Sequence, residues 1–517
     1  MRADAPHDLD DHTGDPVVVE SWLAAPALSY RRRPATVVDA LDRCVRLFGD
    51  RPGVIDGGVR LSWKAFADRV EQGAASLLSR GLEPGDAVAV ASGNGLDLAV
   101  LLLACARAGL VMVGLNTRLA PLQWTWMADH MDVRLRLASP AFLDALPGAE
   151  PLGDVLGEAL ERTWAAGPSG LDPESTYAVV FTSGTTGRPK ASQVVHRASV
   201  HSGMSYQRVL QLGPDDVTAV LFPIYYISAM HAHLLPAMLS GSACVLVDTQ
   251  SPRDYVDLLR SEGVSWAYAV PSWWQLALRA GLQNLPSLRR LAAGGAPFPA
   301  DLVVRLREAL PGVRLHDVYG LSETHSPGCI LVDEDFSTHP GSVGRPLDCM
   351  EAQVRDEHDN LLPVGDPGEL WLRGSLVTTG YAHDPAATAA AVVDGWFDTG
   401  DVARLCEHGF VTILDRSKDM INRGGTKIFS AEVEELLRRH PAIEDAAVVG
   451  LPDPLAGEAV AAYLVLCAAV TPAEVRAWVR QGMADYAAPK LVEVLDALPR
   501  NAVGKTDKQT LRRWARA

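Results

Sequence analysis

The sequence is most informative at Thr182-Ser183-Gly184-Thr185-Thr186-Gly187-Arg188-Pro189-Lys190. An apolar run typical of a buried strand, at residues 177–181, precedes this stretch. Glycines let a backbone approach an anion closely, hydroxyl groups donate to phosphate oxygens, and a lysine adds positive charge. The stretch therefore predicts a phosphate-binding loop. It is not the common P-loop, which has glycine directly before its lysine and a hydroxyl residue after it, because Pro189 precedes Lys190 and Ala191 follows it.

Buried strands alternate with helical patterns on both sides of this loop. We expect strands at 86–92, 217–222, 243–247 and 266–270, with helices at 35–47 and 96–108 and a strand edge followed by a helix within 61–80. This alternation predicts a layered α/β fold with parallel strands. After Gly341, short strands at 351–355, 368–374 and 410–414 predict a small β-rich subdomain.

The last hundred residues have the pattern of a compact α+β segment. A helix is expected at 431–439 with Ser430 as its N-cap, and a second helix at 472–481. Strands are expected at 446–451 and 459–466. A chain of 517 residues exceeds the usual size of one domain, so more than one hydrophobic core is expected.

The net charge of −16 argues against a nucleic-acid partner, whose binding surface would be basic. The acidic N-terminus lacks the basic start and apolar core of a secretory signal, and we expect residues 1–30 to be a mobile acidic tail. The seven cysteines show no C-x-x-C spacing, which predicts reduced, mostly buried thiols in a cytoplasmic protein. The apolar stretch at 98–115 is interrupted by Arg107, so it predicts a buried helix and strand rather than a membrane span.

Five further blocks follow the loop in a fixed order: Gly294-Gly295-Ala296-Pro297, Asp317-Val318-Tyr319-Gly320-Leu321-Ser322-Glu323, Gly395-Trp396-Phe397-Asp398-Thr399-Gly400-Asp401, Asp415-Arg416-Ser417-Lys418-Asp419 and Gly504-Lys505. Together with the loop, this set resembles the ANL superfamily of adenylate-forming enzymes, which includes acyl-CoA synthetases, peptide-synthetase adenylation domains and luciferases. The resemblance implies ATP, Mg²⁺ and coenzyme A as cofactors and co-substrates.

The resemblance also implies roles for single residues. Thr182 to Lys190 would hold the β- and γ-phosphates, and Gly294 to Pro297 would line the adenine and acyl pockets. Tyr319 and Asp317 would contact adenine, Ser322 the α-phosphate, and Glu323 the Mg²⁺ ion. Asp401 would accept hydrogen bonds from the ribose hydroxyls, with Arg416 at the ribose or phosphate. Lys505 would bridge the carboxylate and the α-phosphate during adenylation.

In this superfamily the C-terminal domain rotates between two half-reactions. The resemblance therefore implies an N-terminal domain at 31–415, a hinge at 416–418 centred on Lys418, and a rotating domain at 419–517. The segment Arg423-Gly424-Gly425-Thr426-Lys427 matches the loop that lines the pantetheine tunnel during thioester formation.

Four positions depart from the family pattern. Ala191 and Ala229 stand where glycine is usual, Ser322 where threonine is usual, and Tyr226 where histidine is usual. Tyr226 would still gate the carboxylate pocket, and Ser322 keeps a hydroxyl group. The changes surround the adenylating site, so weak adenylation with intact thioester formation is one hypothesis.

The acid-binding segment contains no carboxylate that could bind an amino-acid substrate. It contributes Tyr225, Tyr226, Ile227, Met230 and His231, with His325 nearby in the family pattern. This composition predicts an apolar pocket for a hydrophobic carboxylic acid of moderate or bulky size. We expect the histidines, His233 included, to be packed more often than to act as specificity groups.

The leading interpretation is an acyl-CoA ligase that forms an acyl-adenylate and transfers the acyl group to CoA. A carrier-protein thiol supplied in trans is the alternative acceptor, and a non-catalytic adenylate-binding relative is the alternative class. Retention of Lys190, Glu323, Asp401, Arg416 and Lys505 speaks against the latter. The sequence leaves the identity of the acid and a homodimeric state open.

Overall fold

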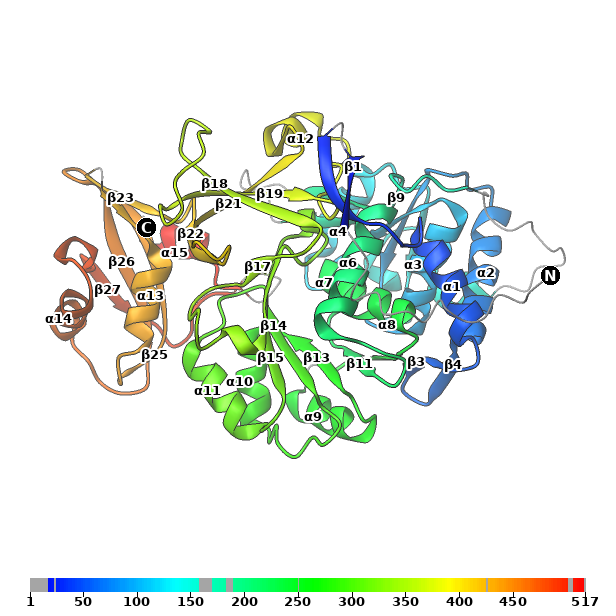
Figure 1. The fold of residues 1–517 in the computed structure, drawn as a ribbon, viewed down its shortest axis with the longest axis horizontal. Helices are drawn as coiled ribbons and strands as arrows, with labels where there is room; N and C mark the ends of the chain where they lie inside the picture. Colours follow the sequence, from blue (N-terminus) through cyan, green and yellow to red (C-terminus); the bar gives the residue numbers. More distant parts are fainter. Residues whose placement is uncertain are drawn as a thin grey trace. The chain divides into compact units, whose positions relative to one another are not determined.

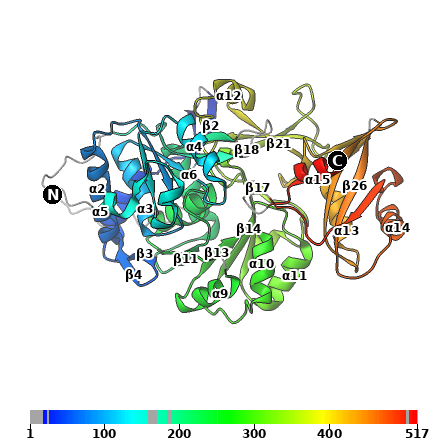
Figure 2. The same ribbon diagram turned by 180° about the vertical axis from the view of Figure 1, so that it is seen from behind.

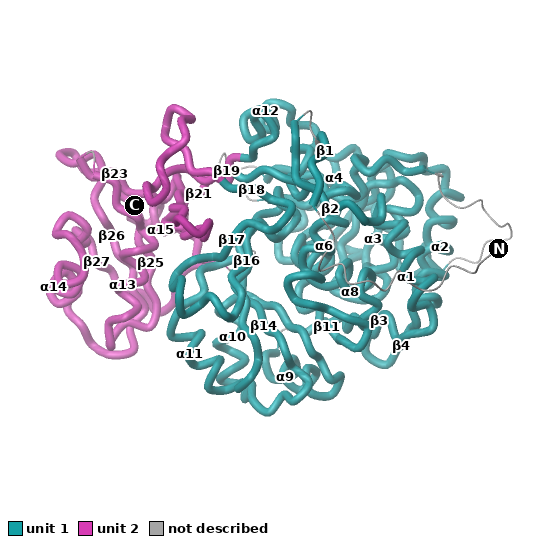
Figure 3. Tube along the Cα trace, in the orientation of Figure 1, with its two compact units in different colours: residues 1–352, 372–397 teal, residues 353–371, 398–517 magenta. Residues whose placement is uncertain are grey.

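A computed structural model describes residues 17–22, 25–157, 170–182, 189–249, 251–424, 426–500 and 505–515. The chain forms two compact units. The first comprises residues 1–352 and 372–397, and the second comprises residues 353–371 and 398–517 (Figure 3). The predicted arrangement of a domain at 31–415, a hinge at 416–418 and a domain at 419–517 concerns which parts rotate, and it stays a prediction.

The first sheet of unit 1 has the strand order β10-β9-β6-β5-β7-β8. Its strands are β5 (Ala87–Ala91), β6 (Val111–Gly114), β7 (Leu135–Ala138), β8 (Glu150–Pro151), β9 (Thr176–Thr182) and β10 (Lys190–Val195). All neighbours are parallel except β9 and β10, which form an antiparallel pair. Every residue of β5 and β6 is buried, as expected for a central strand that is covered on both faces.

The second sheet of unit 1 has the order β17-β16-β15-β14-β13-β11-β12-β3-β4. Its strands are β3 (Pro52–Asp56), β4 (Val59–Ser62), β11 (Val217–Val220), β12 (Ala243–Leu246), β13 (Trp266–Ala269), β14 (Arg290–Gly294), β15 (Arg314–Tyr319), β16 (Cys329–Leu331) and β17 (Arg345–Pro346). The pairs from β3 through β15 are parallel, and only the edge pairs are antiparallel. The predicted layered α/β fold with parallel strands is confirmed.

Helices cover these sheets (Figures 1 and 2). The α-helices of unit 1 are α1 (Val37–Phe48), α2 (Trp63–Ser79), α3 (Leu96–Ala108), α4 (Pro121–His130), α5 (Leu152–Gly157), α6 (His196–Leu210), α7 (Ile227–Ala229), α8 (Leu235–Ser240), α9 (Pro252–Ser261), α10 (Pro271–Arg279), α11 (Ala300–Ala309) and α12 (Pro385–Ala391). A π-helix, η4 (Met230–Leu234), joins α7 to α8, and short 3₁₀ turns occur at η3 (Pro140–Ala145), η5 (Ser322–Thr324) and η6 (Asp333–Asp335). Among the described residues, no helix is both long and apolar enough to cross a membrane.

A five-stranded sheet contains the positions at which the chain passes between the two units. It consists of β18 (Met350–Arg355), β19 (Gly368–Gly374), β20 (Val392–Val393), β21 (Trp396–Leu405) and β22 (Val411–Arg416), in the order β18-β19-β21-β20 with β22 beside β21. This is the β-rich subdomain that the sequence predicts.

Unit 2 ends in a sheet with the order β24-β23-β26-β25 and with β27 beside β26. The elements are β23 (Ile421–Arg423), β24 (Thr426–Ile428), α13 (Ser430–Arg438), β25 (Ile443–Asp453), β26 (Gly457–Leu466), α14 (Pro472–Gly482), η7 (Asp485–Ala487), β27 (Leu491–Val494) and α15 (Lys508–Trp514). Ser430 is not the N-cap of α13, because the helix already includes it and Phe429 occupies the capping position. Its hydroxyl group instead donates to the carboxylate of Asp415, at 3.1 Å.

The expectation of a mobile tail over residues 1–30 is wrong for its second half. Residues Val17–Trp22 and Ala25–Tyr30 form the antiparallel strands β1 and β2, whereas residues 1–16 lie outside the described part. Ser29 and Tyr30 are buried, and their hydroxyl groups bond to His201 at 2.8 Å and to Ser205 at 2.9 Å on α6. These tertiary bonds order a segment that is mostly apolar and contains one acidic residue, Glu20, unlike residues 1–16.

Candidate active site

The phosphate-binding loop connects β9 to β10. Thr182 ends β9 opposite Lys190, which begins β10, so the two ends of the loop are held together by the strand pair. The predicted phosphate ligands Ser183, Gly184, Thr185, Thr186 and Gly187 lie outside the described residues. Ala191 is buried in the core, where its methyl group packs with the first sheet, and its carbonyl accepts a hydrogen bond from Ala382 at 2.8 Å.

Lys190 and Glu323 are brought together by a residue that the sequence analysis did not single out. The ammonium group of Lys190 lies 4.7 Å from the ring centroid of Tyr381, and the Tyr381 hydroxyl donates to Glu323 Oε1 at 2.8 Å. Tyr381 is buried, and it forms a β-bridge with Ser192. The signal that could have found it is the pair Gly380-Tyr381 shortly after the predicted strand at 368–374.

Glu323 lies in the short turn η5 that follows β15. Gly320, between the strand and this turn, has no room for a side chain, because a Cβ atom there would lie 1.5 Å from the carbonyl oxygen of Ser326. The carbonyl of Glu323 accepts a hydrogen bond from the Thr378 N–H at 2.8 Å. The close approach of the Ser326 carbonyl to Gly320 and the hydrogen bond from Thr378 hold the backbone of the turn. In this turn Ser322 is half-buried and Glu323 is buried.

The predicted adenine-binding residues lie at the carboxyl ends of two neighbouring parallel strands. Gly294 ends β14 opposite Val318 of β15, next to Asp317 and Tyr319. A Cβ atom on Gly294 would lie 2.5 Å from both the Tyr268 hydroxyl and the Val318 carbonyl, so this approach requires glycine. Ligands of open α/β sheets bind at this edge. The following residues, Gly295 with φ +76° and then Ala296 and Pro297, are exposed.

Asp317 is buried, and its carboxyl group has a hydrogen bond with the backbone of Val318. Burial raises the pKa of Asp317 to about 8, against the lowering effect of a hydrogen bond from the Val318 N–H. At pH 7 this carboxyl group is mostly protonated, so it can donate as well as accept a hydrogen bond. A purine edge, which presents a donor next to an acceptor, suits such a group.

The predicted acid-binding residues surround the start of α7. Tyr225 is buried, with its hydroxyl 3.1 Å from Thr117 Oγ1, and its ring lies 5.0 Å from that of Tyr226. Tyr226 is half-buried, and burial raises the pKa of its hydroxyl group. Ile227 begins α7, and Met230 begins the π-helix η4 and is buried. π-Helical turns occur frequently at functional sites because they displace side chains from the regular helical register.

The histidines behind this segment are buried and bonded to the protein. His231 accepts from Ser199 through Nε2 at 2.9 Å and donates to the Ile227 carbonyl through Nδ1 at 2.7 Å. His325 accepts from the Val195 N–H at 3.2 Å and donates to the Leu376 carbonyl at 2.9 Å. Burial lowers the pKa of His231 to about 4, and that of His325 well below its ordinary value, so both rings are neutral at pH 7.

His233 is likewise buried, with Nδ1 2.6 Å from Thr218 Oγ1, and burial lowers its pKa to about 3. The expectation that these histidines are packed is confirmed. The assignment of His231 and His325 to the acid pocket stays a prediction that rests on the family pattern, since the ring nitrogens of both residues are bonded within the protein.

Unit 2 carries the second group of predicted site residues. Asp401 on β21 is paired with Arg416 on β22, and Arg416 Nε lies 2.7 Å from Asp401 Oδ1. Asp401 is buried, whereas the Arg416 side chain is 42% exposed. Lys505 is exposed, and its ammonium group lies close to this pair. Desolvation by the surrounding atoms, and then repulsion from Arg416, lower the pKa of Lys505, while Asp401 acts in the opposite direction and Lys418 adds to the lowering.

The predicted pantetheine-binding loop is the turn of the β23–β24 hairpin. Arg423 donates to the Tyr486 carbonyl at 2.5 Å, and Gly424, with φ +60°, donates to the Ala456 carbonyl at 2.7 Å. Gly425 lies outside the described residues. The turn end of the hairpin is therefore held by bonds within unit 2.

Unit 1 thus holds polar groups at a strand edge that suits ligands, and unit 2 holds a buried carboxylate with cations beside it. The family model for AMP-binding enzymes matches residues 41–382, and that for the AMP-binding enzyme C-terminal domain matches residues 432–505. The chain belongs to the AMP-binding enzyme family. The resemblance to the ANL superfamily of adenylate-forming enzymes is thereby confirmed.

Several relatives of this chain are named as CoA ligases or CoA synthases. A ligase from Rhodococcus jostii is 32% identical to this chain, over 93% of this chain and 99% of the ligase. Its name gives its substrates as CoA and a 3-(7a-methyl-1,5-dioxo-octahydro-1H-inden-4-yl)propanoyl group. A feruloyl-CoA synthase from Amycolatopsis is 32% identical over 91% of this chain and 97% of its own. The structure of o-succinylbenzoate coenzyme A synthetase from Bacillus subtilis with ATP and magnesium ion aligns with a TM-score of 0.84 at 27% identity, covering 92% of this chain and 99% of that one.

Proposed function

We propose that this AMP-binding enzyme is an acid–thiol ligase that makes an acyl-CoA from a hydrophobic carboxylic acid, ATP and CoA. In the first half-reaction a carboxylate oxygen attacks the α-phosphorus of ATP and pyrophosphate leaves. In the second, the CoA thiol attacks the acyl carbonyl, its proton is released and AMP leaves. Relatives that are named CoA ligases and that align over nine-tenths of both chains support this reaction.

The observation that carries the proposal is the cluster of Asp401, Arg416 and Lys505 in unit 2. These residues come from β21, β22 and the segment before α15, and they combine one buried carboxylate with two cations. A carboxylate can accept hydrogen bonds from two vicinal hydroxyl groups, which suits a ribose. The two cations suit an α-phosphate and the attacking carboxylate, whose negative charges would otherwise repel each other.

The residues of unit 1 supply the remaining contacts to Mg·ATP. Lys190 would hold the β- and γ-phosphates together with the loop that precedes it, and Glu323 would hold Mg²⁺. The carboxylate of Glu323 fits a hard cation, because such ions prefer oxygen ligands. The bound ion would neutralise phosphate charge. Asp317 and Tyr319, at the carboxyl ends of the strands, would contact the adenine edge and face.

The second half-reaction calls for a different arrangement of the same chain. We assign the hinge to Lys418, in the turn between β22 and β23, and the pantetheine-binding loop to residues 423–427. A hinge residue absorbs a change of backbone angles while the bodies on either side stay rigid. This assignment rests on the family pattern together with the exposed position of the hairpin turn.

The acid pocket favours a bulky, ring-bearing acid. Tyr226 is half-buried in front of the buried Tyr225 and Met230, so the segment is aromatic and apolar, and no carboxylate side chain occurs between Phe222 and Leu235 to bind an amino group. The named acyl groups of the relatives, which include feruloyl and 2-succinylbenzoyl groups, carry rings as well. Because the reaction consumes ATP and CoA, we place it in the cytoplasm.

Product analysis by mass spectrometry tests the function. The enzyme is incubated with Mg·ATP, CoA and a panel of aryl, fatty and polycyclic acids, in parallel with synthetic acyl-adenylates. We expect acyl-CoA from at least one free ring-bearing acid. Acyl-CoA from adenylates alone would support a relative with weak adenylation, and acyl transfer to a carrier protein without transfer to CoA would replace the proposed acceptor.

A further inference from the structure

Tyr381 stands between the two residues of unit 1 that would hold the charged parts of Mg·ATP. Its hydroxyl group donates to Glu323 Oε1 at 2.8 Å, and the ammonium group of Lys190 lies 4.7 Å from its ring centroid. The described part of the chain shows no ion pair between Lys190 and Glu323. The phenol therefore satisfies both charged groups without letting them neutralise each other.

The backbone around Tyr381 is anchored to the strand that begins with Lys190. Tyr381 bridges Ser192 of β10, and the next residue, Ala382, donates to the carbonyl of Ala191 at 2.8 Å. The position of the tyrosine relative to the lysine is thus set by strand pairing rather than by a flexible loop.

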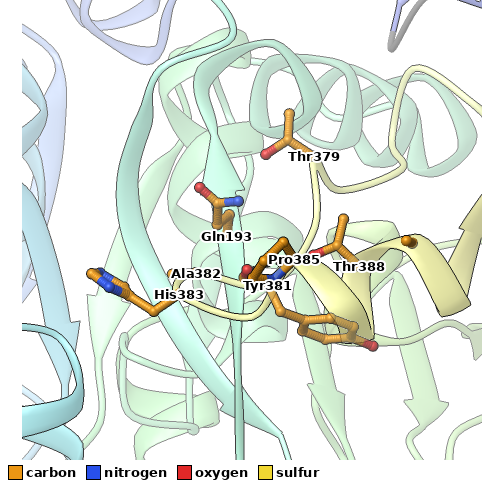
Figure 4. A pocket seen from close by; sticks show the side chains of 8 residues that line it. Gln193, Thr379, Tyr381, Ala382, His383, Pro385 and Thr388 are labelled. Carbon is orange, nitrogen blue, oxygen red and sulfur yellow. Dashed lines mark hydrogen bonds between the residues drawn. The ribbon is translucent and has the colours of Figure 1, made fainter.

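A second anchor comes from α12. The Tyr381 N–H donates to Thr388 Oγ1 at 2.9 Å, and Figure 4 shows the two residues side by side at the start of this helix. Gly380, with φ +132°, permits the approach, since a Cβ atom there would lie 2.3 Å from Thr388 Cγ2. An open pocket of ≈ 510 Å³ lies against these residues.

We propose that Tyr381 is a positioning residue that holds the Glu323 carboxylate and the Lys190 ammonium group apart and oriented for Mg·ATP. The hydroxyl fixes one carboxylate oxygen through a charge-assisted hydrogen bond, and the carboxylate keeps lone pairs for a metal ion. The negative face of the ring attracts the ammonium group without removing its charge. This inference rests on the proposed function, since it takes Glu323 as the Mg²⁺ ligand and Lys190 as the phosphate ligand.

Calorimetric titration of ATP, with and without Mg²⁺, tests the inference without requiring the acid. Tyr381→Phe keeps the ring and removes the hydroxyl, so it should raise the Kd of Mg·ATP by about tenfold, as expected for the loss of one hydrogen bond to a charged group. The Kd of metal-free ATP should change by less than about twofold, since the ring under Lys190 remains. Tyr381→Leu removes both the hydroxyl and the ring, so it should also raise the Kd of metal-free ATP.

Tyr463→Phe is the matched control. It loses a buried phenol hydrogen bond, to the Leu511 carbonyl at 3.2 Å, in unit 2. We expect unchanged affinities for both forms of ATP. If Tyr381→Phe does not fold, Thr388→Val, which removes the acceptor of the Tyr381 N–H, should show the same dependence on Mg²⁺ at smaller amplitude.

The outcomes separate the inference from the proposed function. Wild-type protein that binds no Mg·ATP would contradict both. The role of Tyr381 alone would be overturned if wild-type protein binds Mg·ATP and the Tyr381→Phe variant binds it equally well. The same conclusion would follow if the variant binds Mg·ATP and metal-free ATP more weakly by the same factor.

Discussion

Replacing Asp401 by asparagine is expected to weaken nucleotide binding much more than it weakens the fold. The buried Asp401 carboxylate accepts from Arg416 Nε at 2.7 Å and, in the proposed complex, from both ribose hydroxyls. Asparagine keeps the size and one acceptor oxygen but loses the charge. A hydrogen bond to a charged group contributes about 1.5–3 kcal/mol. Losing the charge toward two hydroxyls should therefore cost about 2–3 kcal/mol, or roughly 30- to 150-fold in the Kd of ATP.

The effect on stability is smaller because the Arg416 side chain is 42% exposed. Water takes over its interactions when the carboxylate is neutralised, so the free energy of unfolding should fall by only about 1 kcal/mol. Thermal unfolding of the ligand-free variant measures this change separately from binding.

The assay is a cycle of two proteins and two nucleotides. Wild-type protein should bind 2′-deoxy-ATP more weakly than ATP, because one hydroxyl donor is missing. The Asp401→Asn variant should show a smaller difference between the two nucleotides, because its neutral side chain gains less from that hydroxyl. Equal differences in the two proteins would refute the assignment of Asp401 to the ribose, whatever the loss of overall affinity.

Three further predictions concern single residues. Lys505→Ala should abolish acyl-CoA formation from free acid while preserving it from synthetic acyl-adenylate and CoA, and loss of both activities would place Lys505 in the fold rather than in the first half-reaction. The folded-state pKa of Asp317, about 8, is raised above its unfolded value, so its contribution to stability is complete below about pH 4 and is lost as pH rises toward 8. In wild-type protein the free energy of unfolding should therefore fall with pH by at most about 1.4 kcal/mol per pH unit, and chemical denaturation of Asp317→Asn should lack this decline. Parallel plots of unfolding free energy against pH for the two proteins would contradict this prediction. Gly320→Ala would place a methyl group 1.5 Å from the Ser326 carbonyl oxygen, and we expect a destabilisation of about 3 kcal/mol or more in urea unfolding together with weakened Mg·ATP binding, whereas wild-type behaviour would mean that the turn carrying Glu323 is not constrained.

Local patterns were sufficient for the main elements of the fold. The runs at 86–92 and 96–108 lie within a few residues of β5 and α3, because continuous apolar runs of strand length and helical length differ in the sequence itself. The Gly294-Gly295 turn was also recognisable, because glycine permits turns and a close approach of other groups to the backbone. The phosphate-binding loop was recognisable for the same reason, since its glycines and hydroxyl groups stand close together in the chain.

The errors share one cause, which is bonding between residues far apart in the chain. Ser430 looked like an N-cap because serine favours that position, but the carboxylate of Asp415 takes its hydroxyl group. Residues 17–30 were grouped with the acidic tail before them, although they are mostly apolar, because their hydrogen bonds from Ser29 and Tyr30 to α6 were not known. A local pattern contains no information about such partners.

The sequence by itself determined the α/β class, the order of the polar blocks and the family to which they belong, because each of these is written in short, contiguous residue patterns. Only the tertiary structure decided that Lys190 and Glu323 meet across Tyr381, that Asp401 pairs with Arg416 near Lys505, and that His231 and His325 are neutral. Those properties depend on distance and burial, which arise when segments from different parts of the chain pack together and remove their side chains from water.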